Sequence, residues 1–195
     1  GRFALGANID LENQAYPTMV GHGGSGGGVS DYGFRGTFDG RGYTVSNLNG
    51  FTAVKSTYGI FGVIGADAVI KNVAFVNVTI SGNNSGLLAM RCHGTIENVY
   101  IQGSRTNGGN FSGAVVGLMH GNMKNVFVNV EDSTSAGGAA LIGNAEANIT
   151  FENCYAISSK TELKLAGSGT MTTTKCGVAA NEEALKALRE AGYHE

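Results

Sequence analysis

The sequence is poor in charge and in cysteine, and each shortage argues against a class of protein. Charged residues make up 14% of the 195 residues, with 13 basic against 15 acidic side chains. Proteins that bind nucleic acids or anionic membranes usually need a basic face, so neither kind of partner is expected. The three cysteines, Cys92, Cys154 and Cys176, include no CxxC pair and no zinc-finger spacing. They are most simply free, small side chains, and they leave the redox compartment open.

Long apolar segments are missing as well. No apolar run reaches the roughly 18 residues that a membrane-spanning helix requires. No basic segment followed by an apolar one marks a leader. The chain begins at Gly1 and enters the strand-like sequence FALGANIDL almost at once. We therefore predict no membrane insertion, and we expect the chain to be a piece of a longer protein.

What the sequence does contain is a repeated phrase in a background of 32 glycines. Each copy is a short β-like stretch with a central asparagine: VSNL (45–48), IKNVAF (70–75), IENVYI (96–101), MKNVFV (123–128) and FENCYA (151–156). A second, glycine-opened apolar stretch accompanies the phrase: GIFGVIG (59–65), SGLLAMRC (85–92), SGAVVGLM (112–119) and GGAALIGN (137–144). The unit is thus about 25–28 residues long, with two strands and a polar loop.

A stacked β-solenoid is the architecture that fits this unit. Leucine-rich repeats need an L-x-x-L-x-L pattern, which is missing, and helical repeats need a 3.6-residue period. Here apolar residues alternate by two, as in Val126, Val128 and Val130. We predict an all-β parallel solenoid of about five coils, in which each coil packs only on its neighbours.

The repeated asparagine predicts a ladder along one corner of the stack. Asparagine is depleted in strands, but equivalent residues of successive coils lie roughly 4.8 Å apart. Each amide could then bond to the next and stay satisfied when buried. We predict an inward-turned ladder of Asn72, Asn98, Asn125 and Asn153. The alternative is four ordinary turn asparagines on the surface.

The residue before each asparagine alternates in charge: Lys71, Glu97, Lys124 and Glu152. Stacking would place opposite charges side by side at every coil boundary. Such pairs contribute only about 0.2–1 kcal/mol each. We interpret the column as a device that sets the register of the coils on an outward face.

The phrase FRGTFDGRGYTVSNL (34–48), followed by GIFGVIG and the IKNV-type strands, resembles the GLUG-repeat proteins of bacterial and phage surfaces. The resemblance covers residues 1–160. It implies a right-handed parallel β-helix, usually within secreted or surface-displayed multidomain proteins. It supplies no catalytic motif that could be transferred to this chain.

Three segments are expected within one domain. Residues 1–36 should form an N-terminal strand, a glycine-rich loop and a cap, residues 37–160 the coils, and residues 161–195 a final strand and a capping helix. Asn181 suits the start of that helix, and Glu182 and Glu183 suit its first turn. The run GHGGSGGG lacks the lysine of a phosphate-binding loop, so we expect an ordinary loop there.

Two further columns are candidate sites. Asp67, His93, His120 and Asn148 each lie three residues before the first apolar residue of a repeated strand. If their turns stack, the aspartate and the two histidines could hold a metal ion. Their alternative role is that of common turn residues.

Tyr100, Phe127 and Tyr155 lie two residues after the asparagines, with Ala74 in the same place one coil earlier. Strand alternation would turn this column outward, where an aromatic stripe suits sugar rings or a protein partner. The alternative is that the rings belong to the core or lie under a loop.

Catalysis has weak support in the sequence. A glycosidase needs two carboxylates about 5–9 Å apart, but Glu97 and Glu152 should lie two coils, or roughly 10 Å, apart. Asp39, in FDGRG, fits a turn. We find no HExxH and no Ser-His-Asp motif.

The sequence thus predicts a non-catalytic extracellular, cell-surface or virion-surface module, without a cofactor. It would serve as a stiff structural spacer and an adhesion module that recognises a glycan or a protein. One alternative is a carbohydrate-active enzyme domain or its accessory module. The other is a phage decoration or fibre subunit that assembles with copies of itself or with other partners.

Overall fold

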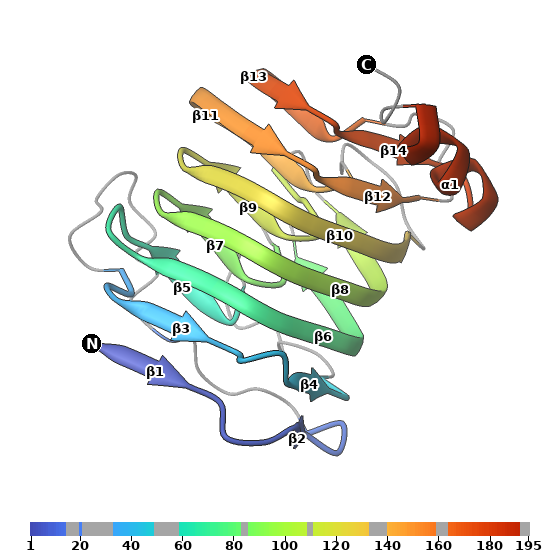
Figure 1. Cartoon of the computed structure of the whole chain (residues 1–195). Coiled ribbons are helices and arrows are strands. Elements are labelled where there is room, and N and C mark those ends of the chain that lie inside the picture. The colour runs from blue at the N-terminus through green and yellow to red at the C-terminus, as the bar shows by residue number, and fades with distance from the viewer. Residues whose placement is uncertain are drawn as a thin grey trace.

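The computed structural model describes residues 1–14, 20, 33–48, 59–82, 86–108, 111–132, 140–158 and 164–191. The protein is an all-β parallel solenoid with one short helix near its C-terminus, which confirms the predicted fold class (Figure 1). The elements are β1 (Arg2–Ala4), β2 (Ile9–Asp10), β3 (Thr37–Asp39), β4 (Thr44–Ser46), β5 (Phe61–Ile64), β6 (Val69–Gly82), β7 (Ala89–Cys92), β8 (Thr95–Gly108), β9 (Val116–Met119), β10 (Asn122–Asp132), β11 (Ile142–Glu152), β12 (Tyr155–Ile157), β13 (Ala166–Thr174), β14 (Gly177–Ala179) and α1 (Glu182–Ala191).

Three coils repeat one plan, a four-residue strand followed by a strand of 11–14 residues. These pairs are β5 with β6, β7 with β8, and β9 with β10. Shorter or less regular strands continue the stack at both ends. The expected five coils therefore correspond to about three regular turns with irregular additions. The chain runs from β1 and β2 at one end to β13, β14 and α1 at the other (Figure 1).

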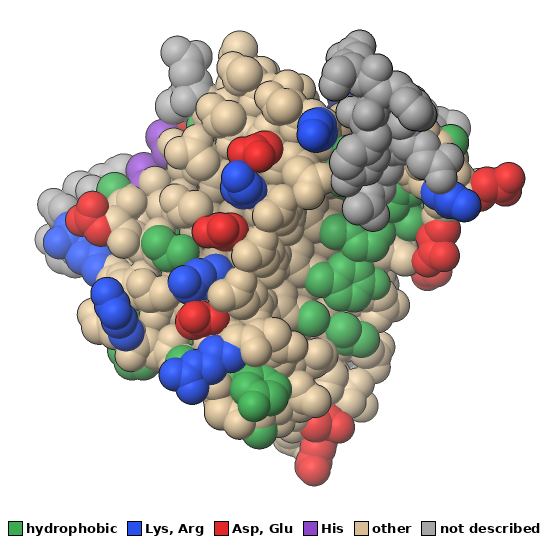
Figure 2. Space-filling view, in the orientation of Figure 1, with side chains coloured by type: hydrophobic (Ala, Val, Ile, Leu, Met, Phe, Trp, Pro, Cys, Tyr) green, Lys and Arg blue, Asp and Glu red, His purple; other side chains and the backbone are tan. Residues whose placement is uncertain are grey.

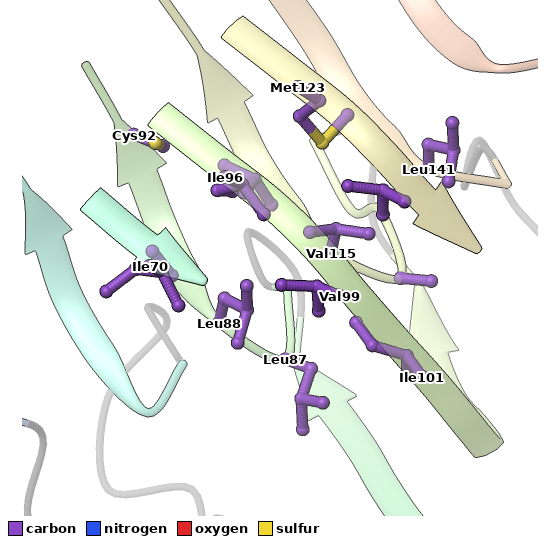
Figure 3. Close-up of a cluster of buried hydrophobic side chains, with 14 of the residues drawn as sticks. Ile70, Leu87, Leu88, Cys92, Ile96, Val99, Ile101, Val115, Met123 and Leu141 are labelled. Carbon is purple, nitrogen blue, oxygen red and sulfur yellow. The ribbon is translucent and has the colours of Figure 1, made fainter. Parts of the chain in front are cut away.

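The stacked strands enclose one main hydrophobic core. Ile70, Ile96 and Met123 are direct neighbours across β6, β8 and β10, and each is almost completely buried. Leu87, Leu88, Val115 and Leu141 enter the same interior from the glycine-opened stretches (Figure 3). Stacking equivalent residues makes the core continuous from coil to coil, as the repeat predicts.

The glycines that open these stretches are required by close packing between coils. A Cβ atom at Gly86 would lie 2.4 Å from the backbone of Val116, and one at Gly113 would lie 2.4 Å from Ile142 Cα. Both distances are far below any van der Waals contact. Glycine is therefore needed at this corner because the next coil passes directly over it.

The long strands bend at single residues in the left-handed conformation. Asn72, Asn98 and Asn125 have φ of 55°, 53° and 53°. Among L-residues other than glycine, asparagine tolerates this conformation best. The repeated asparagine thus marks a corner of the coil rather than the middle of a flat strand.

The predicted C-terminal helix is present and begins as expected. Asn181 Oδ1 accepts a hydrogen bond from the Ala184 N–H at 2.8 Å, which is an N-cap. The helix contacts β12 and β14, where Leu185 packs with Tyr155 and Ala179. It therefore covers the flank of the last coils rather than the end of the stack.

Two other predictions concern the glycine-rich loop and the domain boundaries. The glycine-rich loop lies outside the described residues, and the proposed domain boundaries stay predictions. Within the part of the chain that the structure describes, α1 is too short and too polar to cross a membrane.

Candidate functional site

The asparagines form a hydrogen-bonded ladder along one corner. Asn98 Nδ2 donates to Asn72 Oδ1 at 2.9 Å, Asn125 Nδ2 to Asn98 Oδ1 at 2.8 Å, and Asn153 Nδ2 to Asn125 Oδ1 at 2.7 Å. All the bonds point the same way, each amide donating toward the N-terminal end of the stack. We call this chain the long ladder.

The long ladder is not turned inward, contrary to the sequence prediction. Asn98 is exposed, and Asn72, Asn125 and Asn153 are only partly buried. The reason lies in the corner, where Ile70 and Val73 on either side of Asn72 both take core positions. The left-handed residue between them lies on the outer ridge, so its amide borders solvent.

Asp39 is the acceptor at the N-terminal end of the long ladder. Its Oδ1 accepts hydrogen bonds from Asn72 Nδ2 at 3.0 Å and from the Arg41 N–H at 2.9 Å. These two bonds, together with the positive charge of Lys71, hold the pKa of Asp39 below its ordinary value. Sequence reasoning took Asp39 for a turn residue and missed that it closes the ladder.

A second, shorter ladder lies at another corner. Asn77 Nδ2 donates to Asn47 Oδ1 at 2.6 Å, and Asn47 Nδ2 donates to Asp10 Oδ1 at 2.8 Å. We call this chain the short ladder. Asn47, whose VSNL phrase looks like the other copies, therefore belongs to a different corner from Asn72.

The charged residues beside the long ladder are register neighbours. In the strand register, Lys71 lies opposite Glu97, Glu97 opposite Lys124, and Lys124 opposite Glu152. Lys124 Nζ lies 3.0 Å from Glu152 Oε2, and Lys71 Nζ lies 3.8 Å from Asp39 Oδ2. Figure 2 shows this face, where a column of alternating acidic and basic side chains runs beside a column of hydrophobic ones.

The aromatic column has an open part and a covered part. The rings of Tyr100 and Phe127 stack with centroids 5.4 Å apart and an interplanar angle of 21°, and both side chains are partly exposed. Tyr155 is only 7% exposed because Leu185 of α1 packs on it. The expectation that all three rings face solvent is therefore wrong for Tyr155.

A shallow groove of about 760 Å³ joins the aromatic column to the long ladder. Its lining comprises Asp39, Arg41, Gly42, Asn72, Val73, Ala74, Asn98, Val99, Tyr100, Asn125 and Phe127. Phe127 stacks on one side of Tyr100, whereas the register neighbour on the other side is the small Ala74. This change in size leaves a notch in the aromatic column. We call this surface the ladder groove.

The ladder groove offers polar groups in a regular array. An asparagine amide carries two N–H donors and two acceptor positions, and each ladder bond uses one donor and one acceptor. Asn72, Asn98 and Asn125 therefore each keep a second N–H, at intervals of roughly 4.8 Å. Burial, together with the nearby charge of Glu182, raises the pKa of the Tyr100 phenol, so its hydroxyl stays protonated.

The structure brings two of the three predicted metal ligands together. The imidazoles of His93 and His120 stack with centroids 4.3 Å apart. Asp67 is exposed in a turn that is two residues longer than its counterparts, because Ile64 pairs with Cys92 and Val69 with Thr95. Among the described residues, no group of three or more His, Cys, Asp and Glu is arranged to hold a metal ion. The predicted set of Asp67, His93 and His120 does not assemble.

Sequence reasoning missed Arg91 and Glu146, which complete this histidine cluster. Glu146 Oε2 contacts His120 Nε2 and lies 3.8 Å from Arg91 Nη2. Burial, with the charges of His120 and Arg91, lowers the pKa of His93. Counting three residues back from the first apolar residue of the strand gave Asn148 for this coil, but an irregularity in β11 between Ala145 and Ile149 shifts the register. Aligning the glycine-opened stretches would have placed Glu146 after His120.

A cavity of about 410 Å³ lies near the N-terminal end and has a wholly apolar lining that includes Phe3, Phe34 and Phe61. It continues the core. Because no lining side chain is polar, it provides no side-chain hydrogen bond to orient a sugar.

No protein-family model matches the chain, so membership of the GLUG-repeat family stays a prediction. Over 106 residues, or 53% of the chain, the sequence is 33% identical to Halomucin from Haloquadratum walsbyi, a match that spans 1% of that protein. A crystal structure from Bacteroides ovatus, provisionally named an immunoglobulin A1 protease, has a TM-score of 0.66 and 24% identity. That likeness covers 91% of this chain and 57% of the other. It shows a shared parallel β-solenoid fold.

Proposed function

We propose that this protein is a non-catalytic recognition module of a secreted or surface-displayed protein, and that the ladder groove binds a glycan. The observation that carries the proposal is the notch at Ala74, which leaves one face of Tyr100 without a neighbouring ring. An aromatic face beside regularly spaced amides suits a sugar, which has both an apolar face and hydroxyl groups.

The surroundings of the notch supply the polar part of such a site. The carboxylate of Asp39 and the side chain of Arg41 lie at one end of the groove, and the ladder amides lie along it. Hydroxyl groups spaced along a sugar chain could accept from the spare amide N–H groups or donate to their oxygens. The partial likeness to Halomucin supports a secreted or surface setting.

The groove contains the elements of binding without those of hydrolysis. Asp39 is its single lining carboxylate among the described residues, whereas most glycoside hydrolases use a pair. Glu97 and Glu152 are separated by Lys124, which pairs with Glu152.

The name of the Bacteroides ovatus structure raises proteolysis as an alternative. Cys92 directly precedes His93, but its side chain is completely buried, and burial raises the pKa of its thiol to about 12. A cysteine nucleophile needs an accessible thiolate. This pair therefore does not favour a cysteine protease.

A glycan array with the purified protein tests the proposal. We expect wild-type protein to bind a subset of glycans and Tyr100→Ala to weaken that binding by about tenfold, the equivalent of about 1.4 kcal/mol of lost stacking. Ala74→Phe should have the larger effect and abolish binding, because a ring at this position fills the notch while preserving the column.

Phe111→Ala is the matched control, because Phe111 is 41% exposed and does not line the groove. It should bind like wild type. Binding that survives both Tyr100→Ala and Ala74→Phe would refute the ladder groove as the site. A wild type that binds no glycan but forms oligomers in light scattering would favour a structural assembly subunit instead.

A further inference from the structure

Two of the three cysteines occupy equivalent places in successive coils. Tyr155 pairs with Gly177 across β12 and β14, so Cys154 and Cys176 directly precede register partners. Each cysteine follows a corner residue with positive φ, Asn153 or Lys175. In the three regular coils the same place holds a core valine, Val73, Val99 or Val126. The two thiols therefore continue an inward-facing column.

The contacts of the two thiols show that they share one pocket of backbone. The Cys154 N–H donates to Cys176 Sγ at 3.3 Å. Cys176 Sγ also lies 3.4 Å from the Phe151 carbonyl oxygen, in the coil that contains Cys154. Neighbouring parallel strands lie roughly 4.8 Å apart, which falls within the Cα separation of about 4.4–6.8 Å that disulfides span.

The two thiols differ in a way that suits stepwise oxidation. Cys176 is partly exposed, and the hydrogen bond with the Cys154 thiol lowers the pKa of Cys176 to about 7. Cys154 is buried, and the same hydrogen bond, together with burial, raises the pKa of Cys154. Cys176 is thus the accessible, more acidic member of the pair, and the thiolate is the reactive form.

We propose that Cys154 and Cys176 form an intramolecular disulfide that fastens the last coil to the coil beneath it. The Cys176 thiolate attacks a low-molecular-weight disulfide such as oxidised glutathione, and the S–S bond of that disulfide breaks to release one glutathione thiolate. Cys154 then loses its proton, attacks the mixed disulfide at the Cys176 sulfur and releases the second glutathione. The pair loses two protons and two electrons, and one glutathione disulfide becomes two glutathione thiols.

The bond lies next to the segment that leads into the C-terminal helix. The chain continues from Cys176 through β14 into α1, and α1 covers Tyr155 in the coil beneath. Closing the loop from residue 154 to residue 176 restricts the unfolded chain and so stabilises the folded one. This inference is independent of the proposed glycan binding, because neither cysteine lines the ladder groove.

The test oxidises the full chain and identifies its disulfides. Reduced protein is incubated with oxidised glutathione and then unfolded in denaturant so that buried thiols can react. Free thiols are blocked with iodoacetamide, and the intact mass and proteolytic peptides are measured. We expect one blocked thiol, at Cys92, and a cross-linked peptide pair containing Cys154 and Cys176. The oxidised protein should also melt at a higher temperature than the reduced protein.

Cys92→Ala and Cys176→Ser are the paired controls. Cys92→Ala should keep the cross-link and the shift in melting temperature, whereas Cys176→Ser should lose both. Three blocked thiols in the oxidised wild type, a stable glutathione adduct on Cys176, or a cross-link that involves Cys92 would each overturn the proposal.

Discussion

The long ladder and the short ladder use the same chemistry at two corners of the coil, but only one of them runs through the stack. Each starts from an aspartate that accepts an asparagine amide, Asp39 in the long ladder and Asp10 in the short one. The long ladder continues from Asn72 to Asn153. The short ladder has two asparagines, Asn47 and Asn77.

The short ladder stops because its corner is not repeated. Asn77 is an extra residue in β6, since Val76 pairs with Gln102 and Val78 pairs with Gly103. The next coil has no left-handed residue at that place, and Gln102 Oε1 instead accepts the Asn77 N–H at 3.0 Å. A ladder therefore needs a left-handed corner in every coil, in addition to an amide.

The surroundings of the two corners differ as well. Charged residues of alternating sign precede the asparagines of the long ladder, whereas Ser46 and Val76 precede those of the short one. Only the long ladder lines the ladder groove. The corner that is repeated most regularly is thus also the one that presents a binding surface.

Removing a middle rung should distinguish the ladders most strongly. Asn98→Ala deletes two ladder bonds and forces alanine into a left-handed conformation, so we expect a loss of about 3 kcal/mol in the free energy of unfolding. Asn77→Ala deletes one ladder bond at a similar φ and should cost about 2 kcal/mol. Chemical denaturation measures both values.

Asn98→Gly separates the two contributions to the first result. Glycine adopts the left-handed conformation without strain, so this variant should lose only the hydrogen bonds, or about 2 kcal/mol. Equal losses for Asn98→Ala and Asn77→Ala would show that the long ladder is no more important to the fold than the short one.

Low pH should weaken the hydrogen bonds between each ladder and its terminal aspartate. Hydrogen bonds hold the folded-state pKa of Asp39 and Asp10 below the ordinary value of 3.8. The stabilisation is therefore complete above that value and is lost as the pH falls through the lower, folded-state pKa. We expect the melting temperature of wild type to decrease when the pH is lowered below about 4.

Replacing each aspartate with asparagine tests this assignment. Asp39→Asn and Asp10→Asn keep an acceptor oxygen but cannot be protonated in this range, so each should reduce the acid dependence of the melting temperature. Asp39→Asn also removes the partner of Lys71. Acid profiles that match wild type in both variants would contradict the role of the two carboxylates.

Reversing a charge beside the long ladder should have the smallest effect. Lys124→Glu places a third acidic residue between Glu97 and Glu152 and removes the 3.0 Å pair with Glu152. These side chains are about half exposed, so we expect a loss of about 0.5–1 kcal/mol that shrinks at high salt. A loss that is independent of salt would mean that the column does not act through charge.

The parallel β-solenoid could be predicted because the residues that shape each coil are close in sequence and recur from coil to coil. A left-handed asparagine, an alternating apolar strand and a glycine at a crowded corner recur in every regular coil, so the sequence displays each requirement several times. The charge column and the long ladder follow from the same spacing.

The departures from prediction arise where the repeat breaks or where distant segments meet. Asn47 has the right spacing for the long ladder but lies at another corner, because it follows β4, which pairs with the part of β6 beyond Asn72. Tyr155 is buried by a helix that follows it by 27 residues. Glu146 was missed because β11 is irregular after Ala145. None of these features has a repeating signal.

The most direct test of glycan binding at the ladder groove is a nuclear magnetic resonance titration of ¹⁵N-labelled protein with an oligosaccharide selected on the array. We predict that the side-chain amide signals of Asn72, Asn98 and Asn125 shift on titration and that those of Asn47 and Asn77 do not. In Tyr100→Ala the same titration should produce weaker shifts. If bound glycan leaves the three groove amides unmoved, or shifts the two sets equally, the ladder groove is not the binding site.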